Sequence, residues 1–187
     1  MDVHTAAETG TRARTRRAIL DAAVTVLTAD PTAPLADVAT AAGVGRTTVH
    51  RYFPERAELL TALSRHVQDQ VVEATYRARL GENTAAQALA RLCQEYFDLG
   101  AVLTLVFNDP AQSEVWDECS PTDLAVLDLI GRGHSDGTID PGFSPAWVRD
   151  LLWALLYTAW QQSTTDQVSR HDALDACLRA LRKLITP

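Results

Sequence analysis

Cysteines are too few and too scattered in this 187-residue sequence to build a disulfide framework. Cys93, Cys119 and Cys177 are far apart and odd in number, and no pair has the spacing of metal ligands. Cys93 and Cys177 fall on helix faces, where we interpret them as small apolar side chains. We therefore expect neither a disulfide framework nor a metal site.

Long apolar runs are also missing. The longest strongly apolar stretch, Leu151–Trp160, is about half of the roughly 20 residues that a helix needs to cross a bilayer. The first residues, MDVHTAAETGTRARTRR, contain no apolar segment of the kind found in secretory signals. We expect no membrane-spanning segment, no membrane partner and a cytoplasmic location.

Strand signals are almost absent, and the periodic apolar pattern predicts an all-α fold. Hydrophobic residues make up 47% of the chain, enough to bury a substantial core. Proline, glycine and polar capping residues divide the pattern; Ser120-Pro121 and Ser169, for example, each precede an aspartate at the third helical position. The expected helices are 12–29, 35–42, 46–52, 55–79, 84–107, a short one at 111–119, 121 to near 134, 145–162, and 170 to near 185.

Charge is distributed unevenly along the chain. The formal net charge is -7, yet residues 11–56 carry seven arginines against four acidic side chains. The N-terminal part is therefore basic, and the remainder is more acidic than the average. Such a separation is typical of a protein that meets phosphates at one end.

A helix-turn-helix is the simplest interpretation of residues 35–52. Two short helices meet at Gly43-Val44-Gly45, where glycine allows the backbone of a tight corner, and Ala39 and Ala42 permit close approach. Val44, Val49 and Phe53 fill the space behind the second helix. Its remaining side chains are not needed for that core, and all of them donate hydrogen bonds: Arg46, Thr47, Thr48, His50, Arg51 and Tyr52.

The segment LADVATAAGVGRTTVHRYFPERAELLTAL resembles the signature of the TetR family of transcriptional regulators. It has the small-residue helix, the Ala-Gly-Val turn, the short polar-then-aromatic recognition helix, Phe-Pro and a leucine-rich helix. The preceding RAILDAAVTVLTADP is similar to the family's first helix, so the resemblance covers about residues 11–64. His50 and Thr47 depart from the pattern, since many members have an aromatic and a small residue there, which puts the base preference in doubt.

The resemblance implies a two-part architecture. An N-terminal three-helix, helix-turn-helix DNA-binding domain, residues 1–54, would precede a C-terminal helical bundle for ligand binding and dimerisation, residues 55–187, with the helix 55–79 linking them. The partner at the first domain would be double-stranded operator DNA. Family contacts map by position to the recognition helix and the start of the next helix, and the basic first helix adds phosphate contacts. The predicted DNA-binding residues are Arg46, Thr47, Thr48, His50, Arg51, Tyr52, Arg56, Arg16 and Arg17, with Arg12 and Arg14 along the same backbone or groove.

Two helices near the C-terminus have apolar stripes that favour a homodimer. The helix 145–162 is apolar nearly all round, so both the core and a partner must cover it. Two recognition helices about one DNA turn apart would then bind a near-palindrome. The predicted interface residues are Trp147, Leu151, Leu155, Leu174, Leu178 and Leu181, which would otherwise belong to a monomer core.

A pocket for a small, largely apolar molecule is implied by the resemblance, while its occupant is not. Aromatic and aliphatic residues of the bundle are the candidates, although such residues also build ordinary cores. They are Tyr96, Phe97, Leu103, Phe107, Trp116, Leu127, Ile130, Trp153 and Tyr157. Gly100, in the middle of the helix 84–107, indicates a kink or a close approach there.

Enzymatic motifs do not occur in the sequence. It contains no Walker A loop, GxGxxG, GxSxG or HExxH, and we expect neither a cofactor nor an enzymatic activity. The acids around His134, Asp136 and Asp140 have turn or capping roles available. The expected function is that of a repressor released from its operator by a small molecule; the alternatives are a protein-binding helical adaptor and a helical enzyme.

Overall fold

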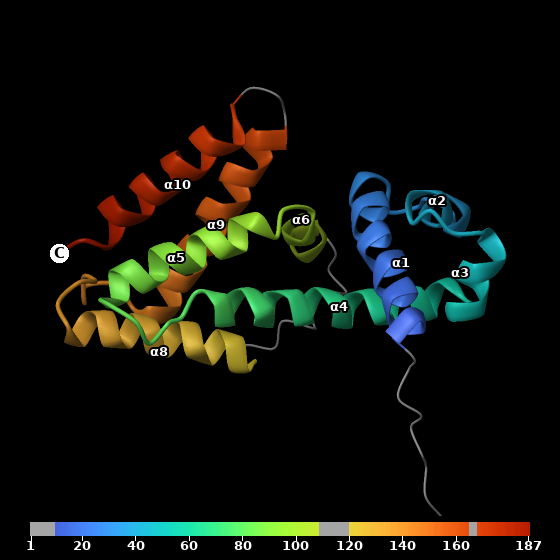
Figure 1. Ribbon diagram of the computed structural model, residues 1–187. Coiled ribbons are helices and arrows are strands. Elements are labelled where there is room, and N and C mark those ends of the chain that lie inside the picture. The colour runs from blue at the N-terminus through green and yellow to red at the C-terminus, as the bar shows by residue number, and fades with distance from the viewer. Residues whose placement is uncertain (1–9, 109–119, 165–167) are drawn as a thin grey trace, which may run out of the picture. The chain divides into compact units, whose positions relative to one another are not determined.

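The computed structural model describes residues 10–108, 120–164 and 168–187 (Figure 1). Within these ranges every regular element is a helix and no strand occurs, so the all-α prediction is confirmed. No helix in the described residues is both long and apolar enough to cross a membrane. The predicted helix at 111–119 lies outside the described residues.

The chain divides into two compact units, Met1–His66 and Val67–Pro187. The first contains three helices, α1 (Gly10–Ala29), α2 (Leu35–Ala41) and α3 (Arg46–Tyr52), together with the start of α4 (Arg56–Arg77). α2 packs against both α1 and α3. The buried residues of this unit include Ile19, Leu20, Ala23, Leu27, Val38, Ala39, Val49, Phe53, Leu59 and Leu63.

The corner between α2 and α3 has the backbone that its sequence predicts. Gly43 has φ +65, and a Cβ added there would meet no atom within 4 Å, so the backbone angle rather than crowding favours glycine. The amide of Val44 donates to the carbonyl oxygen of Ala39 at 3.0 Å and closes the turn. Gly45, in an extended conformation, precedes the first turn of α3.

The first part of α4 belongs to the first unit. Leu59 and Leu63 are buried, and Nε2 of His66 lies 2.7 Å from Oδ1 of Asp21 on α1. These contacts explain why the units divide between His66 and Val67, inside α4, whereas the sequence-based boundary was residue 54. α4 is thus shared between the two units.

The second unit contains the rest of α4 with α5 (Ala85–Asp98), α6 (Ala101–Asn108), α8 (Pro121–Ser135), α9 (Pro145–Thr164) and α10 (Arg170–Ile185). α9 and α10 form the most extensive helix pair, and α5 packs against α8, α9 and α10. The last turn of α10 carries Arg182 and Lys183, both exposed. The fully buried side chains of the core include Leu89, Leu92, Tyr96, Phe97, Ile130, Ile139, Leu152 and Leu156.

The capping signals at two helix starts are confirmed. The hydroxyl of Ser120 accepts from the amide of Asp123 at the start of α8, where Pro121 takes the first position. The hydroxyl of Ser169 accepts from the amide of Asp172 in the same way at the start of α10. These caps satisfy amides that a helix start leaves unbonded.

The prediction of one continuous helix over 84–107 is wrong, because the chain breaks between α5 and α6. Gly100 has φ +56, a left-handed conformation that a helix interior does not contain. A Cβ at this position would lie 2.9 Å from Cη2 of Trp160, too close for a carbon contact. The glycine therefore ends α5 and lets the Trp160 ring lie directly against the backbone.

Candidate functional site

The polar face of α3 is held outward by two buried anchors. Val49 and Phe53 are almost completely buried in the first unit, which fixes the orientation of the short helix. The opposite side presents the side chains that the sequence analysis selected for DNA. Arg46, Thr47, His50 and Arg51 are exposed, while Thr48 and Tyr52 are half-buried.

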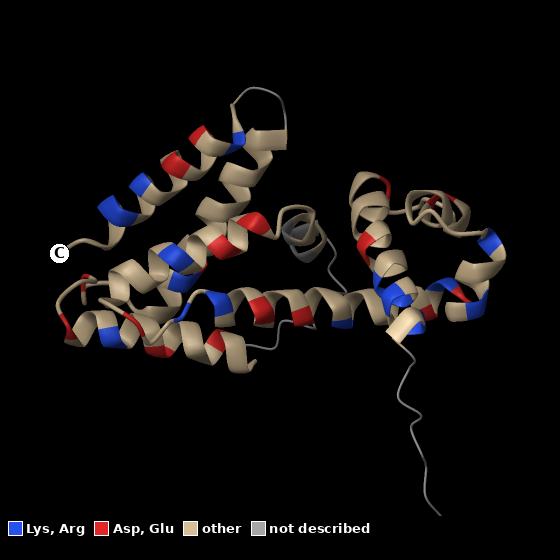
Figure 2. Cartoon of the chain, in the orientation of Figure 1, with Lys and Arg blue, Asp and Glu red and all other residues tan. Residues whose placement is uncertain are grey.

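Arginines gather around the C-terminal end of α3. The guanidinium carbons of Arg12 and Arg51 lie 5.7 and 5.6 Å from the centroid of the Tyr52 ring, within the range of a cation–π contact. Figure 2 shows basic positions at the start of α1, along α3 and at the start of α4. The start of α1 therefore extends the cationic surface of α3 through Tyr52.

Arg56 and Arg16, both predicted to bind DNA, also have contacts within the first unit. Arg56 Nη2 donates to the carbonyl oxygen of Pro31 at 2.6 Å, and Nη1 donates to that of Ala33. Arg16 lies over the Phe53 ring, 5.5 Å from its centroid. Arg17 is exposed. Arg56 therefore links the α1–α2 loop to the start of α4 in addition to any role at phosphates.

The predicted ligand-pocket residues fall into three groups, which are buried, half-buried, or outside the part of the chain that the structure describes. Tyr96, Phe97 and Ile130 are buried in the core, and Leu127, Trp153 and Tyr157 are half-buried. Leu103 and Phe107 lie in α6, with side chains outside the described part, and Trp116 lies outside the described residues altogether.

An aromatic stack lies at the centre of this group. The rings of Tyr96 and Trp153 are 5.0 Å apart and nearly parallel, at 12°. The Tyr96 hydroxyl is within 2.8 Å of Oγ1 of Thr75 on α4. Burial raises the pKa of Tyr96 to about 12, despite the hydrogen bond with Thr75. The phenol therefore stays neutral and joins α4 to α5 and α9.

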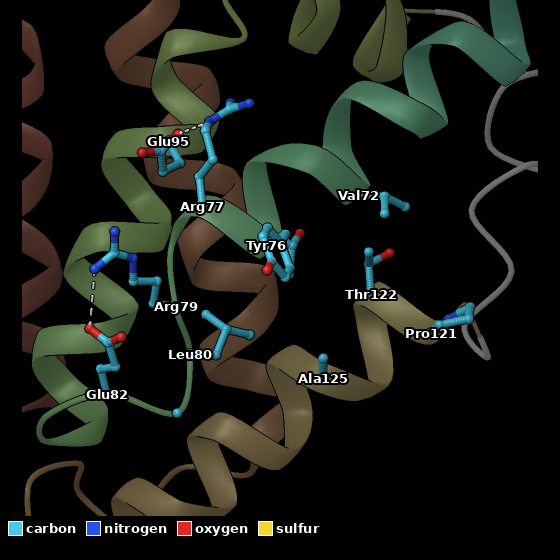
Figure 3. A pocket seen from close by; sticks show the side chains of 12 residues that line it. Val72, Tyr76, Arg77, Arg79, Leu80, Glu82, Glu95, Pro121, Thr122 and Ala125 are labelled. Atoms are coloured by element: carbon cyan, nitrogen blue, oxygen red, sulfur yellow. Dashed lines mark hydrogen bonds and ion pairs between the residues drawn. The ribbon is translucent and has the colours of Figure 1, made fainter.

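A hollow of about 950 Å³ opens beside this stack, and none of the six predicted residues whose side chains the structure describes lines it (Figure 3). Its wall consists of the end of α4, the following loop, Glu95 of α5 and the start of α8. Tyr76 and Val72 of α4 are 85% and 53% exposed beside it. Their spacing of four residues puts both on one helix face, and this was the signal available in the sequence. Thr75 lines the hollow and also bonds to Tyr96, so it connects the hollow to the stack.

Two arginines hold the loop that forms one wall of the hollow. Arg91 donates to the carbonyl oxygens of Ala78, Arg79 and Glu82, and Arg132 donates to those of Leu80 and Asn83. The five donor–acceptor distances are 2.5 to 3.0 Å. Arg79 and Asn83 have φ 50 and 63, left-handed values that non-glycine residues rarely adopt. The wall is thus preformed rather than assembled around an occupant.

Charges on the hollow are arranged in pairs. Nε of Arg77 lies 2.7 Å from Oε2 of Glu95, and Nη1 of Arg79 lies 3.7 Å from Oε2 of Glu82 (Figure 3). The Glu95 carboxylate is the less exposed of the two acids, at 30%. The hollow therefore combines an aromatic ring and aliphatic surface with carboxylates.

The predicted dimer residues are exposed or half-buried with one exception. Trp147 is 58% exposed, and Leu151, Leu155, Leu174 and Leu178 are half-buried. Leu181 is instead 1% exposed in the core of its own chain, because it occupies the buried face of α10. It has no surface left for a partner, and we remove it from the predicted interface.

The acids near the end of α8 have structural roles, as their positions suggested. Asp136 accepts from the amides of Ala85 and Thr138, and Asp140 accepts from the amide of Gly142. Hydrogen bonding, first from the Thr138 hydroxyl, lowers the pKa of Asp136. Among the described residues, no three His, Cys, Asp or Glu side chains are grouped so that they could hold a metal ion.

Comparisons with known proteins agree with the helix-turn-helix. The family model described as bacterial regulatory proteins, tetR family, matches residues 19–63. The HTH-type transcriptional repressor LfrR of Mycolicibacterium smegmatis is 41% identical over 177 residues, which are 93% of this chain and 92% of that protein.

Solved structures show the same relationship. The TetR-like transcriptional regulator LfrR from Mycobacterium smegmatis, in complex with proflavine, is 39% identical, with a TM-score of 0.71 over 93% of this chain and 98% of that one. A TetR family transcription regulator from Marinobacter aquaeolei VT8, 18% identical, has a TM-score of 0.71 over 95% of this chain and 98% of that one, and shows the fold alone. From the matched helix-turn-helix and the extent of the likeness to LfrR, the chain belongs to the TetR family of DNA-binding transcriptional regulators.

Proposed function

We propose that this protein is a repressor that binds operator DNA as a homodimer and leaves it when a small molecule binds the second unit. The observation that carries the proposal is the polar, cationic face of α3, held outward by the buried Val49 and Phe53. The repressor LfrR, similar along nearly the whole chain, supports the direction of regulation. DNA binding belongs to residues 1–54, and ligand binding and dimerisation to 55–187, with α4 as the link.

Arg46 and Thr47 stand at the N-terminal end of α3, the end that approaches base edges in a major groove. Arginine can bond guanine through two parallel hydrogen bonds, and the threonine methyl group can contact thymine. Thr48, His50, Arg51 and Tyr52 then face phosphates or flanking bases. Arg16, Arg17 and Arg56 contribute charge at the border of this surface, with Arg56 also holding the α1–α2 loop.

The dimer forms through α9 and α10. Trp147, Leu151 and Leu155 of α9 and Leu174 and Leu178 of α10 keep apolar surface that the single chain does not cover. Burying such surface between two copies is favourable at about 25 cal/mol per Å². A two-fold axis here would place two α3 helices on one near-palindromic site.

The ligand is a flat, largely apolar molecule that carries a positive charge. LfrR has been solved with proflavine, a flat aromatic amine of this kind. The hollow beside α4 and α8 offers the Tyr76 ring for stacking. It also offers a cation the Glu95 carboxylate, of which Oε2 pairs with Arg77 and Oε1 is not part of that pair. Behind it, Thr75 bonds to Tyr96, which stacks on Trp153. A ligand that separates Thr75 from Tyr96 shifts the position of α4, and the conformation that fits the operator becomes less populated.

DNA binding can be tested by selection from a random pool of duplexes about 30 base pairs long. This method needs no assumption about the operator sequence. We expect a near-palindrome to be enriched. Arg46→Ala should weaken binding to it roughly tenfold to hundredfold, for the loss of a bidentate base contact. Arg51→Ala should also weaken it, for the loss of a phosphate or flanking-base contact. Arg179→Ala removes the same charge from an exposed position on α10 and serves as the control.

The proposal fails if Arg46→Ala and Arg51→Ala bind the selected duplex as tightly as the control. Circular dichroism and sedimentation of each variant show whether fold and dimer are intact. Binding of the wild-type protein should also fall steeply as salt rises, because bound arginines release counterions from the phosphates.

Proflavine is the probe for the ligand site. It should raise the Tm of the DNA-free protein, since a ligand specific to the folded state stabilises it. Tyr76→Ala should weaken proflavine binding by roughly tenfold, the loss expected for one aromatic contact, whereas Tyr157→Ala should not if the hollow is the site. Because proflavine also binds DNA, the thermal shift is measured without it; equal affinity of wild type and Tyr76→Ala would place the ligand elsewhere.

A further inference from the structure

Two cysteines that are 84 positions apart in the chain meet inside the second unit. Sγ of Cys93 on α5 lies 3.6 Å from Sγ of Cys177 on α10. Both are free thiols, 0% and 4% exposed. Neither takes part in the proposed DNA, ligand or dimer contacts. From the sequence alone, each is interpreted as a separate small apolar side chain.

We propose that Cys93 and Cys177 form a reversible disulfide that links α5 to α10 when the protein meets a peroxide. The two sulfur atoms are already neighbours, so the bond needs a closure of about 1.5 Å to reach the length of a disulfide, about 2.05 Å. Both residues lie in the interior of regular helices, and α5 and α10 pack against each other along the same seam. The link therefore joins two elements that are already in contact.

The pair is chemically asymmetric. The hydrogen bond from Cys93 lowers the pKa of Cys177, while the same bond and burial raise the pKa of Cys93. Cys177 is therefore the thiol that ionises first, and the thiolate is the reactive form.

The reaction has two steps with hydrogen peroxide as the oxidant. The Cys177 thiolate attacks one peroxide oxygen, the O–O bond breaks, and Cys177 becomes a sulfenic acid as water leaves after proton transfer. The Cys93 sulfur then attacks the Cys177 sulfur, the S–O bond breaks, and a second water leaves. Two thiols and one peroxide give one disulfide and two waters. A thiol reductant such as dithiothreitol reverses the result by disulfide exchange.

A small hollow lies along the same seam, close to the thiols. A hollow of about 180 Å³ lies between α5 and α10, lined in part by Ala90 and Leu178. Ala90 precedes Cys93 by three residues on α5, about one helical turn, and Leu178 follows Cys177 directly. Peroxide is small enough to enter such a space, and local opening of the helix pair would then expose the thiols to it.

The link would fix the helix that carries part of the proposed dimer face. Leu174 and Leu178 flank Cys177 on α10 and keep partly exposed surface. Oxidation would hold α10 against α5 without using any of that surface. We therefore expect the oxidised protein to remain dimeric and to resist unfolding of its second unit.

The experiment uses the full chain with Cys119→Ser, so that Cys93 and Cys177 are the only thiols. After treatment with hydrogen peroxide, maleimide labelling under denaturing conditions and intact mass measure the thiols. We expect both thiols to be lost together, the mass to fall by two hydrogens, and one peptide to contain both residues. The Tm of the oxidised protein should rise by roughly 10 °C, the shift expected for a crosslink closing a long loop, and dithiothreitol should restore the original value.

Cys93→Ala and Cys177→Ala in the same background are the matched controls, and neither should show the mass loss or the rise in Tm. The proposal is overturned if both thiols survive peroxide treatment, if only one is oxidised to a sulfinic acid, if the crosslink joins two chains, or if it lowers the Tm. Every readout is independent of DNA and proflavine. If the disulfide does not form, the repressor proposal still stands, and if the repressor proposal fails, the disulfide proposal is unaffected.

Discussion

Adding one methyl group at Gly100 should destabilise the second unit more than the same change at Gly137, where an added Cβ would meet no other atom. Two effects act together at this position. The backbone at φ +56 disfavours a side chain by about 1 to 2 kcal/mol. The new Cβ would also lie 2.9 Å from Cη2 of the Trp160 ring, and overpacking of this kind destabilises by about 1 to 3 kcal/mol. We expect Gly100→Ala to lower the free energy of unfolding by about 2 to 5 kcal/mol.

Two other glycines separate these effects. Gly137 has φ +72 with no atom within 4 Å of an added Cβ, so Gly137→Ala reports the backbone effect alone. A Cβ at Gly133 would lie 2.6 Å from Cγ1 and 2.9 Å from Cβ of the buried Ile139, a tighter contact than at Gly100, without a left-handed backbone. Gly133→Ala therefore reports crowding alone, offset by about 1 kcal/mol of gained helix propensity. Gly100→Ala should therefore exceed Gly137→Ala by the cost of the contact with Trp160.

Tryptophan fluorescence during urea unfolding is a suitable assay, because all four tryptophans follow residue 66 and report on the second unit. A Trp160→Phe background supplies the second half of a double-mutant cycle, since the shorter ring removes the atoms nearest Gly100. There the cost of Gly100→Ala should fall toward that of Gly137→Ala. The reasoning is refuted if Gly100→Ala costs no more than Gly137→Ala, or if its cost is unchanged by Trp160→Phe.

Three further predictions concern pH, assembly and salt. The pKa of Tyr96 is raised from near 10 to about 12, so its neutral form contributes stability below pH 10 that is lost as pH rises through 12. Urea titrations of the wild-type protein should show this loss, on the order of 2 to 3 kcal/mol. The same titrations of Tyr96→Phe should not show it. Leu178→Asp should convert the dimer to monomer in sedimentation equilibrium, whereas Asp175→Ala on the same helix should not, and a dimeric Leu178→Asp would contradict the proposed interface. Arg12→Ala should lower the slope of log affinity against log salt by about 1 if Arg12 contacts one phosphate, and an unchanged slope would remove Arg12 from the DNA surface.

Features encoded by neighbouring residues could be predicted from the sequence. The caps at Ser120 and Ser169 depend on residues three positions apart, so their pattern is visible without a fold. The corner at Gly43 and the buried Val49 behind α3 follow from the same local pattern. For this reason the helix-turn-helix could be placed to within a residue or two.

Features that depend on contacts between distant residues could not be predicted from the sequence. Gly100 indicated a kink, but the break between α5 and α6 depends on Trp160, 60 positions later, whose ring requires the missing side chain. The contact between Cys93 and Cys177 depends on how α5 packs against α10. Leu181 shared an apolar stripe with Leu178, and only packing shows that it belongs to the core. The hollow likewise combines α4, α5 and α8, so no single stretch of sequence outlines it.

Lys183, at the exposed end of α10, is the only lysine in the chain. A dye or surface linker that reacts with side-chain amines will therefore attach there and nowhere on α1 or α3. Every cation on the proposed DNA surface is an arginine or a histidine, and such reagents leave its charge intact. The molecule thus offers a single lysine for immobilisation or fluorescence, on the helix farthest in sequence from the residues whose binding would be measured.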